Sequence, residues 1–395
     1  MGIFAEYLDG GFGTDAAKLS AERKKQLARI CDIRKNDVLV YAVDVTKGKS
    51  PITINYSDLL PLTDQIANLK GERLDLILET PGGSGETSED IVKLLRGRFS
   101  FLGVIVAGMA KSTGTLLAMA ADEILMEPMS ALGPIDAQIT WQGKQFSAHA
   151  LLEGMEKIKE EVIATGSLNR AYVPILQNIS PGELQGAQNA LDFASDLVTE
   201  WLAKYKFKDW ATHSSTGKPV TDADRRQRAN EIAARLRNHS NWKTHGRSIK
   251  VDDLRAMRLK ITDYTDNPEL ADAIRRYYTL LQMTFQSNVY KVFETSTSQI
   301  MRLEAAQAEH IAPATFPQGA LAGAVEAKVK CKKCGATATL QARFDPAVPK
   351  KAGVPQFPDS NLIPCPGNCG TSHNLTAMRQ QMQAQFGRPI VGEKA

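Results

Sequence analysis

The sequence predicts an α/β fold built on a parallel sheet, followed by a helical extension and a small cysteine-bearing domain. Short β-branched runs alternate with helical patterns over residues 37–126, as in chains that form parallel sheets. The 395 residues are 43% hydrophobic and 23% charged, which is typical of a globular chain. Four of the five cysteines lie in two close pairs near the C-terminus, so we expect a separate small domain there.

The elements of the sheet domain follow one another in a regular order. A polar-rich helix with an apolar side precedes a strongly β-branched run, and three further helix and strand patterns follow. Connections of this length call for right-handed crossovers between parallel strands. We expect helices over residues 16–35, 56–69, 88–98 and 113–121, and strands over 37–45, 74–78, 104–107 and 123–126.

Beyond residue 147 the pattern becomes helical and stays so to about residue 309. Ser180, Pro181 and Glu183 together form a helix start signal, and an Ala-rich stretch with prolines then reads as a linker. We expect an N-terminal helix over residues 1–36, the sheet domain over 37–165, a helical extension over 166–304, a linker over 305–328, the cysteine domain over 329–375 and a tail over 376–395.

Charge and hydropathy restrict the location and the partners. The net charge is +4, but residues 204–260 hold fifteen Lys or Arg against six Asp or Glu. This section is either a solvated helical surface or a contact for nucleic acid or an acidic protein. The first residues lack the apolar run of a signal peptide, and the longest apolar stretch, 104–121, is interrupted by Lys111, Ser112 and Thr113. We therefore expect a cytoplasmic protein with no membrane span.

Ser112 is the candidate nucleophile. It follows a predicted strand and begins a predicted helix, so its hydroxyl and the next amide should lie at the carboxyl edge of the sheet, where helix dipoles favour negative charge. The Thr113 amide would be one oxyanion donor and the Gly83 amide, in the loop after the preceding strand, the second. The loop could instead hold a phosphate, although it lacks the P-loop ending, and Ser112 could simply cap its helix.

Three segments resemble a known family. Residues 79–83 read ETPGG, residues 110–124 read AKSTGTLLAMAADEI, and residues 130–136 read SALGPID. They are similar to the core of the serine dehydrogenase proteinase family, which is related to Clp protease and signal peptide peptidase A in the Clp/crotonase superfamily. The resemblance implies a Clp/crotonase-like parallel β-sheet with repeated ββα/βαβ units. It also implies serine peptidase activity, a nucleophilic Ser112, oxyanion amides at Gly83 and Thr113, and assembly into homo-oligomeric rings.

The general base is the least constrained part of this hypothesis. Clp proteases carry a His one helix after the serine, but residues 132–139 contain none. Relatives of signal peptide peptidase A use a downstream Lys, a role that needs a desolvated amine. Lys157 is the best-placed candidate, near the border of the apolar face of a predicted helix, whereas Lys159 falls on its polar side.

Two histidines are alternatives to Lys157. His149 begins the same predicted helix, and His245 lies in a segment, WKTHGRSI, that also resembles a downstream His-Gly motif of the family. His245 could act as a base or could hold the helical extension in place. Asp136 could orient a partner or cap a turn.

The cysteine domain has the spacing of a zinc ribbon. Cys331 and Cys334 form one short pair, and Cys365 and Cys369 form the other; each short loop lets two thiolates face one tetrahedral ion. We expect a structural Zn²⁺ held by these four residues, with His373 as a possible substitute ligand. Because four sulfurs close the coordination shell, the predicted role is recruitment of a protein or nucleic acid rather than catalysis.

Three functions remain open at this point. The first is hydrolysis of a peptide or protein substrate through an acyl-enzyme on Ser112, with a Lys or His base. The second is a catalytically silent oligomeric scaffold that binds a protein or nucleic acid through its basic helices and ribbon. The third is acyl-thioester chemistry, since crotonase relatives hold a thioester oxyanion with similar paired amides.

Overall fold

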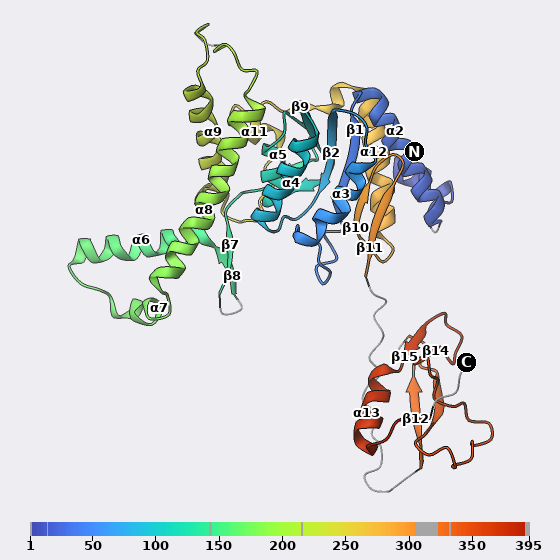
Figure 1. Cartoon of the computed structure of the whole chain (residues 1–395). Helices are drawn as coiled ribbons and strands as arrows, with labels where there is room; N and C mark the ends of the chain where they lie inside the picture. The colour runs from blue at the N-terminus through green and yellow to red at the C-terminus, as the bar shows by residue number, and fades with distance from the viewer. Residues whose placement is uncertain are drawn as a thin grey trace. The chain divides into compact units, whose positions relative to one another are not determined.

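The computed structural model describes residues 2–13, 15–141, 144–214, 216–304, 323–331 and 333–391. They fall into two compact units, Met1–Glu304 and Ala305–Ala395 (Figure 1). Each unit has its own buried apolar core.

A seven-stranded sheet forms the centre of the first unit. Its strand order is β11-β10-β1-β2-β3-β5-β9. Five strands are parallel, whereas β10 runs antiparallel to β1, and β11 antiparallel to β10. The prediction of an α/β fold on a parallel sheet is confirmed. The strands are β1 (Asp37–Val43), β2 (Arg73–Glu79), β3 (Phe101–Val106), β5 (Glu123–Met126), β9 (Thr262–Asp263), β10 (Val289–Glu294) and β11 (Gln299–Leu303).

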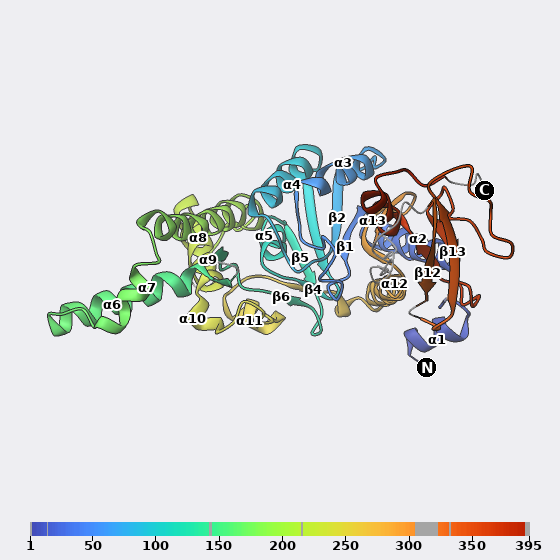
Figure 2. The same cartoon turned by 90° about the horizontal axis from the view of Figure 1, so that it is seen from below.

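Helices cover both faces of the sheet. Since alternate side chains of a strand point to opposite faces, each buried strand contributes to two apolar cores. In β1, Leu39 and Tyr41 enter one core while Val38 and Val40 enter the other. The first core lies under α3 (Leu59–Ala67), α4 (Gly85–Arg98) and α5 (Thr113–Met119), and the second under α2 (Ala16–Arg34) and α12 (Pro268–Phe285) (Figure 2). The buried strands therefore read as continuous apolar runs in the sequence.

The extension is helical only in part. Its helices are α6 (Ala148–Thr165), α7 (Val173–Leu176), α8 (Pro181–Trp201), α9 (Asp222–Arg237), α10 (His239–Trp242) and α11 (Val251–Ala256). Ser180 caps α8 in a capping box with Glu183, as predicted. The helical prediction was wrong for β9, β10 and β11, which return to the main sheet. The β-branched and aromatic residues of β10 and the Ser/Thr turn at 295–298 favour a hairpin there.

Short elements complete the first unit. An N-terminal helix α1 (Ile3–Asp9) packs on α12. The two-residue strands β4 (Met109–Ala110) and β6 (Ala131–Leu132) pair in parallel, and β7 (Gln138–Trp141) pairs with β8 (Lys144–Ser147). No helix in the described ranges is both long enough and apolar enough to cross a bilayer.

The described residues of the second unit form two small antiparallel sheets and one helix. Its elements are β12 (Ala324–Lys330), β13 (Thr337–Arg343), β14 (Leu362–Pro364), β15 (Ser372–Asn374) and α13 (Thr376–Phe386). Most of the predicted linker, residues 305–322, lies outside the described residues, but β12 begins inside its last part. The predicted tail begins as α13, because Met378 and Met382, one helical turn apart, are buried in the core of this unit.

Candidate active site

Two loops meet at the carboxyl edge of the sheet, one after β2 and one after β3. The Thr80 amide donates to the Met109 carbonyl oxygen at 2.9 Å, and the Lys111 amide donates to the Thr80 carbonyl oxygen at 2.9 Å. A Cβ atom on Gly82 would fall 2.6 Å from Ser112 Cβ. The glycine therefore lets the loop backbone pass directly against the serine side chain.

Ser112 has an unusual backbone conformation, with φ 51° and ψ −120°. For a residue with a Cβ atom this conformation costs about 1–3 kcal/mol, and such strain is found mainly at functional sites. The serine does not cap α5 with its side chain. Within the described residues its hydroxyl makes no hydrogen bond, so it is free to meet a ligand.

Gly83 occupies a position that excludes any larger residue. A Cβ atom there would lie 2.3 Å from the Ile54 carbonyl oxygen. The Ile54 amide donates to the Gly82 oxygen at 2.8 Å, and the Ser84 amide donates to the Ile54 oxygen at 2.9 Å, so the loop is pinned on both sides of Gly83. The amides of Gly83 and Thr113 have no acceptor in the described part of the chain.

These groups border one cavity of about 890 Å³. Its wall is formed by the glycine loop, the start of α5, one side of α8, the segment that contains Asp136 and the segment that contains His245. Apolar side chains, among them Leu116, Ile135 and Phe193, make up part of the remaining wall. The residues are Thr53, Pro81–Glu86, Ser112, Thr113, Leu116, Ile135–Gln138, Gly186, Asn189, Ala190, Phe193, Ala194 and His245.

A buried carboxylate links two histidines beside this cavity. The Asp136 side chain is 0% exposed, and its two oxygens contact different rings: Oδ1 contacts His245 Nδ1, and Oδ2 lies 2.8 Å from His239 Nδ1. Burial alone would raise the pKa of Asp136, but the hydrogen bond and charge of His245 lower it overall. The carboxylate is therefore charged at neutral pH and holds His245 by Nδ1, which leaves Nε2 for another partner.

Only one of the three sequence-predicted bases borders the cavity with Ser112, namely His245. The Lys157 side chain is 70% exposed, and its amine lies 2.8 Å from Glu153 Oε1 on the surface of α6. His149 Nδ1 lies 3.7 Å from the other oxygen of Glu153. Figure 1 shows α6 running away from the sheet, so the described structure does not bring Lys157 or His149 to the serine.

Sequence reasoning missed His239 and gave Asp136 no firm role. The available signal was the pair of histidines flanking the short polar segment 240–244. That signal says nothing about which carboxylate they meet, because Asp136 is about a hundred residues earlier.

Glu79, the last residue of β2, is a buried carboxyl group directly behind the glycine loop. It is 3% exposed, accepts a hydrogen bond from the Met109 amide at 2.9 Å and lies 3.4 Å from the Tyr278 hydroxyl. Burial raises the pKa of Glu79 to about 7, although the Met109 amide opposes the shift. The folded protein thus binds this proton more tightly than the unfolded chain does.

This raised pKa predicts a loss of stability as the pH rises from about 4.5 to about 7, where the folded state gives up the proton. The loss should be on the order of 3 kcal/mol, at about 1.4 kcal/mol per pKa unit. Glu79→Gln, which stays neutral, should remove most of it when unfolding free energies from urea titrations at pH 5 and pH 8 are compared. Glu89→Gln, on the surface of α4, is the control. An unchanged pH dependence in Glu79→Gln would contradict this prediction.

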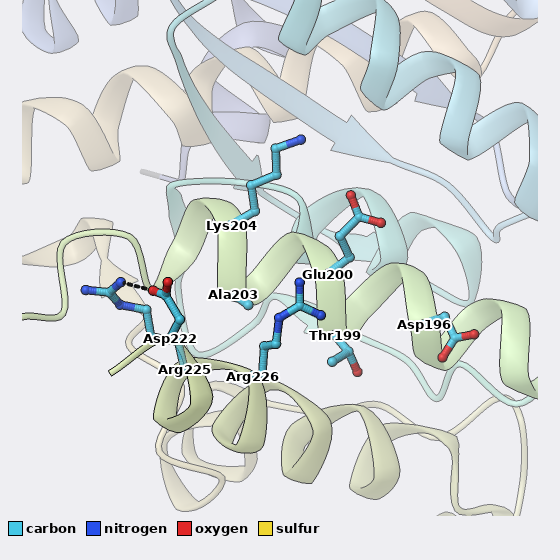
Figure 3. Close-up of a pocket in the computed structure, with 8 residues that line it drawn as sticks. All are labelled: Asp196, Thr199, Glu200, Ala203, Lys204, Asp222, Arg225 and Arg226. Atoms are coloured by element: carbon cyan, nitrogen blue, oxygen red, sulfur yellow. Dashed lines mark hydrogen bonds and ion pairs between the residues drawn. The ribbon is translucent and has the colours of Figure 1, made fainter. Parts of the chain in front are cut away.

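A second cavity, of about 530 Å³, lies between α8 and α9. Figure 3 shows that charged side chains line it, with Arg225 paired to Asp222 at 2.7 Å. Its lining residues are Asp196, Thr199, Glu200, Ala203, Lys204, Asp222, Arg225 and Arg226. They include no serine, cysteine or histidine, so this groove lacks the groups that the chemistry at Ser112 needs.

The four C-terminal cysteines converge in the second unit. Their sulfur atoms all lie within 4.8 Å of one another, with 3.7 Å between Cys331 and Cys369 and 3.4 Å between Cys334 and Cys365. A tetrahedral ion with sulfur bonds of about 2.3 Å would separate its ligands by roughly 3.8 Å. The thiols are free and could hold a metal ion. The ring nitrogens of buried His373 have no hydrogen-bond partner among the described residues, but His373 is not part of this group.

The family model described as "ClpP-like SDH-type serine proteinase" matches residues 23–290. Two curated relatives come from Methanocaldococcus jannaschii. The uncharacterized protein MJ1495 is 30% identical over 37% of this chain and 53% of its own length, and the uncharacterized protein MJ0137 is 38% identical over 34% of this chain and 49% of its own length. The chain thus spans about half the length of these relatives.

Two solved structures show weaker similarity. A mutant of the 1510-N membrane-bound stomatin-specific protease matches 56% of this chain and 79% of its own, with 12% identity and a TM-score of 0.30. A protein from Acinetobacter baumannii described as an enoyl-CoA hydratase/isomerase matches 64% of this chain and 96% of its own, with 13% identity and a TM-score of 0.21. At these scores neither structure adds to the family match.

Proposed function

Because the chain belongs to the ClpP-like SDH-type serine proteinase family, we propose that it hydrolyses peptide bonds through an acyl-enzyme on Ser112, with His245 as the general base. The observation that carries the assignment of the base is the contact of His245 with buried Asp136 at the cavity that Ser112 borders. Asp136 is the positioning residue of this arrangement. The substrate class is a peptide or protein.

The proposed reaction gives each of these groups one role. Asp136 holds Nδ1 of His245, so that the opposite nitrogen, Nε2, can take the Ser112 proton as the hydroxyl attacks the scissile carbonyl. The amides of Gly83 and Thr113, which have no acceptor among the described residues, would donate to the oxyanion that develops. His245 then protonates the leaving amine, and water attacks the acyl-enzyme by the reverse route. The strained backbone of Ser112 supports this role, because it holds the side chain at the cavity.

Lys157 is not proposed as the base. A lysine base must be neutral, which requires burial or a cationic neighbour. The amine of Lys157 is instead exposed, and its neighbour is the carboxylate of Glu153.

The base assignment predicts how labelling of Ser112 by a fluorophosphonate will respond to mutation. His245→Ala and Asp136→Asn should each slow labelling by about 10³-fold or more, as removal of the equivalent groups does in other Ser-His-Asp enzymes. Lys157→Met should label at the wild-type rate, since it removes only a surface ion pair. The measurement is the second-order rate constant of labelling. A slow Lys157→Met variant beside a normal His245→Ala variant would overturn the assignment in favour of a lysine base.

For the second unit we propose a structural Zn²⁺ bound by the four cysteines. The closeness of four free thiols supports this proposal, and zinc is among the metals that soft thiolate ligands select. Four sulfur ligands would leave no position for a substrate, so the ion would stabilise the fold. Homo-oligomeric assembly, a cytoplasmic location and a protein or nucleic-acid partner of the ribbon stay predictions from the sequence.

A further inference from the structure

The residue just before Ser112 reaches the segment that carries His245. The Lys111 amine donates to the Arg247 carbonyl oxygen at 2.9 Å, to Ser248 Oγ at 2.9 Å and to the Gly246 carbonyl oxygen at 3.3 Å. Three acceptors match the three N–H donors of one ammonium group. Lys111 therefore connects the turn before the nucleophile to the three residues that follow the proposed base.

The stem of Lys111 is also held. A Cβ atom on Gly133 would fall 2.8 Å from Lys111 Cδ, so the lysine lies across a glycine with no room for a side chain. The Lys111 backbone is fastened to the glycine loop through its hydrogen bond with Thr80. The backbone and the stem of Lys111 are thus held in place, so the side chain has little rotamer freedom to lose when its amine forms these hydrogen bonds.

The segment that Lys111 holds has few other supports. Residues 243–248 form neither helix nor strand. The remaining hydrogen bonds of Gly246 and Arg247 are local, from their amides to Thr244. Firm pairing with the rest of the unit resumes at Ile249, whose amide and carbonyl pair with Leu132 at 2.9 and 3.0 Å. Between the contact of His245 with Asp136 and the pairing of Ile249 with Leu132, Lys111 is the residue that hydrogen-bonds this segment to the sheet domain in the described structure.

From this geometry we infer that Lys111 is a positioning residue, which fixes the backbone after His245 so that the imidazole stays aligned with Ser112. The inference rests on the proposed function, in which His245 is the base. Lys111 does not touch the substrate in this role: its amine faces the loop carbonyls. Misplacement of a catalytic group by about 1 Å can cost about 10²-fold in rate, which sets the size of the expected effect.

The chain offers a matched control in Lys47. Its amine also donates to three carbonyl oxygens, those of Phe285, Ser287 and Val289, at 2.6 to 2.7 Å. It is absent from the residues that line the Ser112 cavity. Lys47→Met therefore removes the same kind of anchor from the same unit without reaching the site.

The first test is a double-mutant cycle on fluorophosphonate labelling of Ser112. Lys111→Met should slow labelling by about 10- to 100-fold, whereas Lys47→Met should leave the rate unchanged. In the His245→Ala background, Lys111→Met should have no further effect, because its action passes through the imidazole. Equal slowing with and without His245 would show that Lys111 acts on the serine or on the fold, and would overturn the inference.

The second test does not depend on catalysis. Amide hydrogen exchange of a peptide covering residues 243–250 should become at least tenfold faster in Lys111→Met and stay unchanged in Lys47→Met. Unchanged exchange in Lys111→Met would overturn the inference whatever the labelling shows. Faster exchange together with normal labelling would overturn it as well, since the lysine would then hold the loop without positioning the base. By contrast, a His245→Ala variant that labels normally would reject the proposed function, while the exchange result would still report on the anchor.

Discussion

Ser112→Ala should abolish covalent labelling of the folded protein by a fluorophosphonate and lower peptide hydrolysis by about 10³-fold or more. The Ser112 hydroxyl is the group that the proposed mechanism acylates, and removing the nucleophile from such a site leaves only binding and oxyanion stabilisation. The fold should tolerate the change. Alanine removes one oxygen that makes no hydrogen bond in the described structure, although the strained backbone remains.

The measurement is intact-protein mass spectrometry after labelling, with hydrolysis of an unstructured protein such as casein as the second readout. Ser100→Ala is the control, since Ser100 is an exposed serine whose hydroxyl donates to the Glu72 carbonyl oxygen. The control should label like the wild type. Persistent labelling of Ser112→Ala would reject Ser112 as the nucleophile, and a folded wild type that never labels would favour the scaffold hypothesis instead.

Removal of the proposed Zn²⁺ should unfold the second unit and leave the first intact. The apolar core of the second unit is small, with ten described residues buried from β12 to Ile390, and small cores of this kind are often stabilised by a structural metal. Apparent binding free energies of structural Zn²⁺ are about 10–16 kcal/mol in zinc-finger peptides, which exceeds the stability of a typical small domain. Cys331→Ser and Cys365→Ser each replace a buried cysteine of the proposed site. Each substitution should therefore unfold the second unit, as a chelator does.

This outcome can be followed on the full chain. Metal content by elemental analysis should fall from about one zinc per chain to none, and limited proteolysis should begin to cut within residues 323–391. Labelling of Ser112 should continue, because it depends on the other unit. Cys31→Ser, in α2, is the control and should retain the metal. A wild-type protein that contains no zinc, or a cysteine variant as protease-resistant as the wild type, would contradict the proposal.

Local patterns were enough to predict several parts of this protein. Alternating β-branched and helical segments predicted the parallel sheet, because the periodicity of apolar residues directly reflects burial. The serine at a strand-to-helix junction and the glycines after the neighbouring strand were found because parallel strands end at one edge of the sheet. The two cysteine pairs were recognised because each pair spans a single short loop.

Other parts depended on contacts between distant segments. The β-branched and aromatic residues of β10 favour a strand only through a weak local preference, and the pairing of β10 with β1 decides the matter. The carboxylate of Asp136 meets His245 only because Ile249 pairs with Leu132 and carries the preceding loop back to the sheet. Lys157 had suitable spacing from Ser112, but α6 presents it to solvent. Periodicity and spacing report on the immediate neighbours of a residue, whereas Asp136 and His245, 109 residues apart in the sequence, meet through packing between distant segments.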